Sequence, residues 1–263
     1  MEHSVKGKSW THEELLIVCN LYVTLPFGQM HARNPIVVRL ARALGRTPGS
    51  VAMKLVNFAS LDPVHQARGV SGLRGVSRAD REVWEEFHRD WATTAYRSEK
   101  NLRSLLSLER PESKEEELAL SLLQAADRPT DSLATVRVRT MQSFFRRAVL
   151  SAYKSSCCIT GNPIPGLLVA SHILPWSGFP RERVNPKNGL CLVAHFDKAF
   201  DQGLITFGKD MRLKLSSKLR AYLPNEAVEG QFVLLDGAPL RMPERFPPDV
   251  IFLEYHRENV FRG

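Results

Sequence analysis

The chain has 263 residues, 43% of them hydrophobic, and a formal net charge of +8. This length is sufficient for two modest domains with hydrophobic cores, and the basic balance favours a polyanionic partner. No apolar run is long enough to span a bilayer, and the first ten residues lack the core of a signal peptide, so we expect a cytoplasmic protein with no membrane partner.

The charges are distributed unevenly along the chain. Residues 1–80 and 131–263 carry more Lys and Arg than Asp and Glu, whereas residues 81–130 carry the reverse. Two basic parts joined by an acidic one are what separate DNA-contacting modules with a solvated connector would show.

The cysteines do not form a recognisable metal motif. They are Cys19, Cys157, Cys158 and Cys191. Because none of them has paired CxxC spacing, we expect reduced thiols and no structural zinc ribbon.

The first predicted elements are three helices. Thr11 and Glu14 have the spacing of a capping box, and apolar residues follow at helical spacing. A second helix begins at Asn34, which caps the helix, with Pro at the first helical position. A third helix runs from residue 48 to about residue 60, after a tight turn.

The second and third helices, joined by residues 45–47, are typical of a helix-turn-helix. On the third helix we expect Ser50, Lys54 and Asn57 to face outward. Together with Arg46 in the turn, these side chains are the candidate DNA contacts. The alternative is a small helical packing module with a solvated face.

A further helix, capped by Ser77 and Asp80, completes a predicted helical domain at residues 1–98. We expect residues 99–135, which include an acidic stretch, to form a helical linker with a solvated face. A second domain is then expected at residues 136–263.

Apolar side chains recur at helical spacing in residues 140–153 and predict an amphipathic helix that packs beneath the following hairpin. Arg146 and Arg147 lie outside its apolar stripe, so both are candidates for phosphate contacts.

Residues 167–203 contain groups that a hydrolytic metal site needs: His172, Asn188, Asp197 and Asp201. A short apolar run bounded by prolines predicts a strand that carries His172 near its end. The dipeptide Asn188-Gly189 predicts a hairpin turn, because both residues tolerate positive φ. A second strand is expected directly after that turn.

From residue 194 the pattern is helical, and Gly203 is placed to end the helix in a left-handed conformation. Asp197 and Asp201 are four residues apart and therefore share one face of the helix. Two carboxylates repel each other there, and the helix dipole disfavours an anion at Asp201. A bound cation would relieve both costs.

This combination resembles the HNH, or ββα-metal, nuclease family, especially a subfamily with SHI-x-PW, NPxNGLxL and DxAFDxGL. The resemblance implies that His172 is the general base, Asn188 braces the hairpin, and Asp197 and Asp201 are metal ligands. It also implies an α+β protein in which a helical, helix-turn-helix-like domain precedes a ββα-metal nuclease domain.

Two details leave alternatives open. The residue before the base is often a metal-binding Asp or His in this family, but here it is Ser171, which favours Mg²⁺ or Mn²⁺ held by oxygen ligands and water. His195 is the rival for the third motif position, although we expect it on another face of the helix. Trp176 is expected to be a packing residue.

Residues 10–63, which end in SVAMKLxNFASLDP, resemble the N-terminal part of some bacterial HNH nucleases. The whole resemblance implies a metal-dependent DNA endonuclease in bacterial restriction or phage defence. The alternatives are a non-catalytic DNA-binding regulator and a nuclease that acts on RNA. The oligomeric state stays open, with a homodimer as one option.

Beyond residue 203, alternating residues predict a hairpin around Gly208, and a last helix is expected at residues 249–261.

Overall fold

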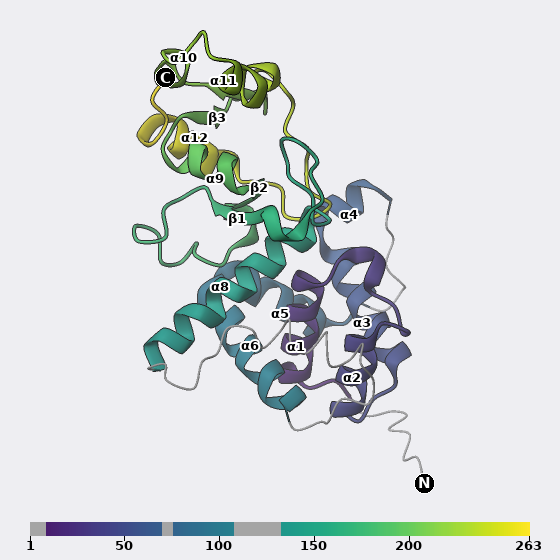
Figure 1. Cartoon of the computed structure of the whole chain (residues 1–263). Helices are drawn as coiled ribbons and strands as arrows, with labels where there is room; N and C mark the ends of the chain where they lie inside the picture. Colours follow the sequence, from purple (N-terminus) through teal and green to yellow (C-terminus); the bar gives the residue numbers. More distant parts are fainter. Residues whose placement is uncertain (1–8, 70–75, 108–132) are drawn as a thin grey trace. The chain divides into compact units, whose positions relative to one another are not determined.

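The computed structural model describes residues 9–69, 76–107 and 133–263 (Figure 1). The chain divides into two compact units, residues 1–151 and residues 152–263. The first is helical and the second mixes helices with small antiparallel sheets, which confirms the predicted α+β class.

The division between units differs from the predicted domain limits. Residues 136–151, assigned from sequence to the second domain, belong to the first unit. Within the predicted linker, residues 108–132 lie outside the described residues. The three-part division therefore stays a prediction.

The described residues of the first unit form helices and one short 3-10 turn. In chain order these are α1 (His12–Thr24), η1 (Phe27–Gln29), α2 (Pro35–Ala43), α3 (Pro48–Leu61), α4 (Pro63–Ala67), α5 (Arg78–Arg89), α6 (Trp91–Ser107) and α8 (Leu133–Ala152).

The predicted N-terminal caps are present. The Glu14 amide donates to Thr11 Oγ1 at 3.2 Å, and the Thr11 amide donates to the Glu14 carboxylate at 2.8 Å. Asn34 caps α2 through the Ile36 amide, and Ser77 caps α5 through the Asp80 amide. Because each cap satisfies amides that have no partner within the helix, these local patterns fix where the helices begin.

Helix α1 forms the centre of the first unit. All of its residues from 14 to 24 are buried, and it packs against α3, α5 and α6 (Figure 1). Because neighbouring helices cover this stretch of α1 on every side, no face of it is exposed to solvent, and its sequence is apolar nearly all round.

The second unit contains two short antiparallel sheets and several helices. In chain order its elements are η2 (Pro165–Leu167), β1 (Leu168–His172), η3 (Pro186–Asn188), β2 (Gly189–Val193), α9 (Ala194–Asp201), β3 (Ile205–Phe207), β4 (Leu213–Leu215), α10 (Ser217–Arg220), α11 (Glu226–Gln231), η4 (Val233–Leu235) and α12 (Val250–Asn259).

Strands β1 and β2 pair antiparallel, with Leu168 opposite Val193 and His172 opposite Gly189. Helix α9 follows β2 directly and contacts both strands. The predicted order of strand, strand and helix is confirmed. His172 therefore lies at the end of β1, beside the point where β2 begins.

The predicted two-residue turn at Asn188 and Gly189 is wrong. Gly189 has a φ of −123° and opens β2, while Asn188 ends η3. Residues 173–188 connect the two strands as a long loop. Asn188 does not form a turn, because its side chain is hydrogen-bonded to the backbone of this loop.

Gly203 ends α9 as predicted, with a φ of +68°. A Cβ at this position would lie 2.0 Å from the Val260 carbonyl oxygen, and the Arg262 amide donates to the Gly203 carbonyl at 2.9 Å. Glycine is thus needed both for the left-handed turn and for the close approach of the chain beyond α12. The predicted β3–β4 hairpin and C-terminal helix are also confirmed.

His256 anchors α12 to α9. Its ring stacks on Phe200, with centroids 3.6 Å apart and planes within 6°. Nε2 donates to the Phe200 carbonyl at 3.0 Å, so Nδ1 accepts from the Thr206 hydroxyl at 2.9 Å. This buried contact fixes the end of α9 that carries Asp201.

Candidate active site

His172 has the geometry of a base with an assigned tautomer. Its Nε2 lies 2.8 Å from the Arg183 carbonyl oxygen. A carbonyl oxygen only accepts hydrogen bonds, so Nε2 carries the proton and Nδ1 is the basic nitrogen of the neutral ring. Burial lowers the pKa of His172, an effect that outweighs the Arg183 carbonyl and the charge of Asp197, which both raise it. The neutral form that can take up a proton is thus favoured.

Asn188 joins the two ends of the loop that follows β1. The side chain is buried; its Oδ1 accepts from the Leu174 amide at 2.7 Å, and its Nδ2 donates to the Glu182 carbonyl at 3.0 Å. The Ile173 amide donates to the Asn188 carbonyl at 3.0 Å. The Asn188 side chain therefore binds the start of the loop, at Leu174, and its later part, at Glu182, at the same time.

Asp197 and Asp201 lie on α9, where Asp197 is half-buried and Asp201 is exposed. Reduced solvation raises the pKa of Asp201, and so does the charge of Asp197, while Lys198 lowers it. Asp197 also acts on the pKa of His172. The three candidate residues are therefore electrostatic neighbours.

The donor set near α9 fits a hard divalent cation that keeps water ligands. Two carboxylates offer oxygen atoms. Reduced solvation and, after it, the charge of Asp197 raise the pKa of Asp201, and a cation would offset that charge. Across the described parts of the chain, no group of three or more His, Cys, Asp or Glu side chains is arranged to hold a metal. Water would have to complete the coordination.

The other two residues near the motif do not add evident ligands. Ser171 is buried, and among the described residues its Oγ has no hydrogen-bond partner. His195 is exposed on α9 and its ring lies against Phe196 and Phe232, with centroids 4.3 and 6.1 Å away. Partial loss of solvation lowers the pKa of His195.

Comparison with family models adds an independent observation. Residues 157–208, which include β1, β2, α9 and β3, match the model described as HNH endonuclease. The chain contains an HNH endonuclease domain. This domain supports nuclease activity in general. A comparison with curated proteins finds no match to the chain.

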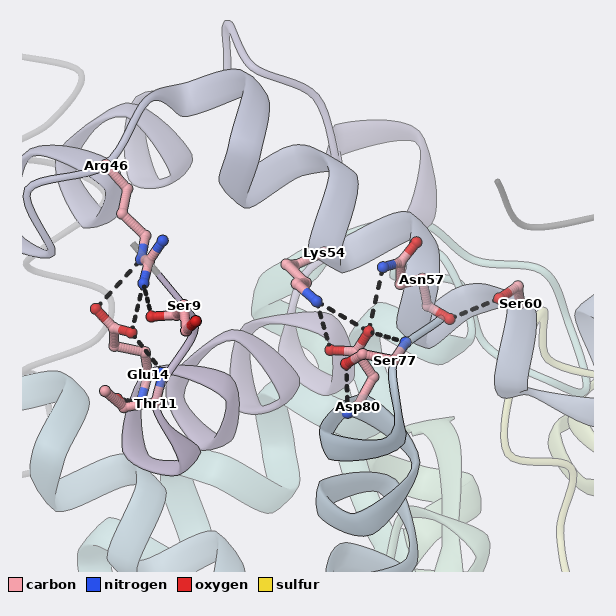
Figure 2. Close-up of polar contacts among 9 residues, drawn as sticks. All are labelled: Ser9, Thr11, Glu14, Arg46, Lys54, Asn57, Ser60, Ser77 and Asp80. Carbon is pink, nitrogen blue, oxygen red and sulfur yellow. Dashed lines mark hydrogen bonds and ion pairs between the residues drawn. The ribbon is translucent and has the colours of Figure 1, made fainter. Parts of the chain in front are cut away.

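Outside the HNH domain, Lys54 and Asn57 do not face outward, so that expectation is wrong. Lys54 Nζ lies 2.8 Å from the Asp80 carboxylate, and Asn57 Nδ2 donates to it at 3.3 Å (Figure 2). Both side chains are buried. The physical reason is that α5 packs against α3, and Asp80 in the first turn of α5 brings its carboxylate into contact with this face.

Arg46 is also engaged within the helical unit. Its side chain is 4% exposed and pairs with Glu14 at 2.8 Å (Figure 2). Its guanidinium carbon lies 3.9 Å from the centre of the Trp10 ring. Ser50 is half-buried, and its amide donates to the Thr47 hydroxyl at the start of α3. The turn therefore presents less polar surface than the sequence pattern predicts.

The two arginines of α8 differ from each other. Arg146 is exposed, whereas Arg147 donates to the buried Glu99 carboxylate of α6 at 2.7 Å. Burial alone would raise the pKa of Glu99, but Arg147 and Arg103 outweigh it and the pKa lies below its ordinary value. Arg147 is thus a structural partner of α6.

Arg183 was not identified by sequence reasoning, and Trp176 was expected only to pack. Both contact the base of the HNH domain: the Arg183 carbonyl through Nε2, and the Trp176 ring at right angles to the imidazole. The neighbouring Pro-Trp in the SHI-x-PW motif was the available signal for Trp176. Arg183 had none, since its contact depends on how the loop folds.

In the described residues, no helix is long and apolar enough to cross a membrane.

Proposed function

We propose that this protein is a metal-dependent DNA endonuclease that serves bacterial restriction or phage defence. The observation that carries the proposal is the HNH domain in which His172 has its basic nitrogen defined by the Arg183 carbonyl and lies in the field of Asp197. The basic character of the chain, with a net charge of +8, suits a DNA substrate.

In the proposed reaction His172 accepts a proton at Nδ1 from the water that attacks the scissile phosphorus. Asn188 keeps the loop closed, so that the base stays at a fixed distance from α9. Asp197 and Asp201 would hold Mg²⁺ or Mn²⁺. When bound, that ion supplies neutralisation of charge on the phosphate and the leaving 3′ oxygen.

The helical unit is proposed to position the DNA, with fewer of the predicted side chains available for contact. Lys54, Asn57 and Arg46 are held by carboxylates of their own unit. Ser50 is half-buried and Arg146 is exposed, and both remain candidates for DNA contact.

The test is cleavage of supercoiled plasmid, of phage DNA with modified bases and of RNA in Mg²⁺, with the wild type and His172→Ala. We expect the wild type to cut DNA and the variant to lose at least about 10²-fold in rate. Cleavage of RNA alone would reassign the substrate. Binding without any cleavage would favour a non-catalytic regulator.

A further inference from the structure

Three contacts connect His172, Trp176 and Arg183 in a closed circle. His172 Nε2 donates to the Arg183 carbonyl at 2.8 Å, and Arg183 Nε donates to the Trp176 carbonyl at 2.7 Å. The rings of Trp176 and His172 meet at 83°, with centroids 5.4 Å apart. The guanidinium carbon also lies 5.1 Å from the centre of the Trp176 ring. Each residue thus restrains the other two.

This circle matters because the tautomer of His172 depends on a loop. The carbonyl that orients the imidazole belongs to residues 173–188, a connection without regular strands. Asn188 holds the loop at Leu174 and Glu182. The Arg183 side chain adds a bridge across the span from residue 176 to residue 183, where the two groups that touch the base are located.

We infer that Arg183 is a positioning residue for the base. Its side chain fixes the Trp176 backbone and, through it, the ring that abuts His172, while its own carbonyl selects the Nε2–H tautomer. The inference rests on the proposed function of His172 and adds to it the groups that hold the base in its productive form.

The competing role for an arginine beside a nuclease site is a direct phosphate contact. The two roles predict different kinetics. A phosphate contact contributes to substrate affinity and to its salt dependence, whereas a positioning residue contributes to the rate of the bound complex. Arg181 is a matched control, because it is an exposed arginine on the same loop, two residues away.

The kinetic experiment compares full-length Arg183→Lys, Trp176→Leu, Trp176→Phe and Arg181→Ala with the wild type. Lysine keeps the charge but lacks the planar guanidinium, whose Nε–H donates to the Trp176 carbonyl while its carbon lies near the Trp176 ring. We expect Arg183→Lys and Trp176→Leu to lower kcat about tenfold or more with little change in KM, since small displacements of a reacting group are costly. Trp176→Phe should recover part of the loss, and Arg181→Ala should leave kcat unchanged.

A second readout does not require activity. In the full chain labelled with ¹⁵N-histidine, long-range ¹⁵N–¹H correlation spectra should report an Nε2–H tautomer for His172 in the wild type and in Arg181→Ala. Arg183→Lys and Trp176→Leu should show a mixture of both tautomers, with thermal unfolding confirming that the chains are folded.

The outcomes separate the two proposals. If the wild type cleaves nothing but Arg183→Lys and Trp176→Leu change the tautomer of His172, the positioning role stands and the proposed function is wrong. An unchanged tautomer and kcat in folded Arg183→Lys would overturn the inference. So would a raised KM with a smaller salt slope at unchanged kcat, which would make Arg183 a phosphate contact.

Discussion

Reduced solvation and the charge of Asp197 together raise the pKa of Asp201, which stands one turn later on α9. Asp197 lies in the first turn of that helix, where the dipole favours an anion, whereas Asp201 lies at the opposite end. Asp201 therefore gains more than Asp197 from a bound cation. The difference gives a prediction at the scale of single residues.

Asp197→Ala should abolish metal-dependent cleavage, and Asp201→Ala should raise the required Mg²⁺ concentration by at least about tenfold, because loss of a ligand weakens metal binding. His195→Ala should have a much milder effect on cleavage. The His195 ring packs against Phe196 and Phe232, and His195 is not one of the proposed metal ligands. Cleavage rates are measured against Mg²⁺, Mn²⁺ and Zn²⁺ concentration. An inactive His195→Ala beside an active Asp197→Ala would give the third motif position to His195.

At the scale of elements, the positions of helix ends followed from sequence and the directions of helix faces did not. Thr11, Asn34 and Ser77 cap helices through hydrogen bonds to amides at most three residues away, so a local pattern is sufficient. The face of α3 depends on α5, which lies elsewhere in the sequence and brings Asp80 to Lys54. Periodicity cannot reveal such a partner.

Lys54→Ala should destabilise the helical unit by about 3–5 kcal/mol, because it leaves the carboxylate of Asp80 buried without its cation. The matched control is Arg78→Ala, which removes an exposed charge paired with Glu82 on α5 and should leave the unfolding midpoint nearly unchanged. Urea unfolding measures both. Equal, small effects would mean that the Lys54–Asp80 pair contributes little.

The contact between α12 and α9 should make stability depend on pH. Burial is the main reason that the pKa of His256 falls from 6.5 to about 4. The unfolded chain takes up this proton near pH 6.5 and the folded chain only near pH 4. The contribution of neutral His256 is therefore complete above the unfolded pKa and is lost as pH falls toward the folded one.

Between pH 7.5 and pH 5.0 the loss should be about 2 kcal/mol. Urea unfolding at both pH values measures it, with His256→Gln as the reference, since glutamine has no proton to take up in this range. The reference should lose less stability than the wild type on acidification. Parallel losses in both chains would show that His256 does not carry the effect.

At the scale of the whole molecule, the order of a helical part and an HNH domain was readable from the sequence, but the groups around the base were not. His172 and Asn188 stand in a recognisable spacing. No sequence spacing marks Arg183 or the long loop, because the loop is held by contacts between residues far apart in sequence. One of them joins Asn188 to Leu174, fourteen positions away. The α8 arginines were likewise ambiguous, since only the fold brings Arg147 to Glu99.

DNA binding by the whole chain should follow the exposure of its basic side chains. Arg146→Ala should weaken affinity and reduce the salt slope by about one unit, as for loss of one phosphate contact, while Lys54→Met should leave the slope unchanged. Fluorescence anisotropy at several salt concentrations measures both. A smaller slope for Lys54→Met alone would return that residue to the DNA surface.

The most direct test of the account is plasmid cleavage in Mg²⁺ by the wild type and His172→Ala, with DNA binding measured in parallel. General-base loss removes stabilisation of the transition state and leaves binding contacts in place. We predict a rate lower by at least about 10²-fold and an affinity close to that of the wild type. Cleavage by His172→Ala at the wild-type rate would contradict it.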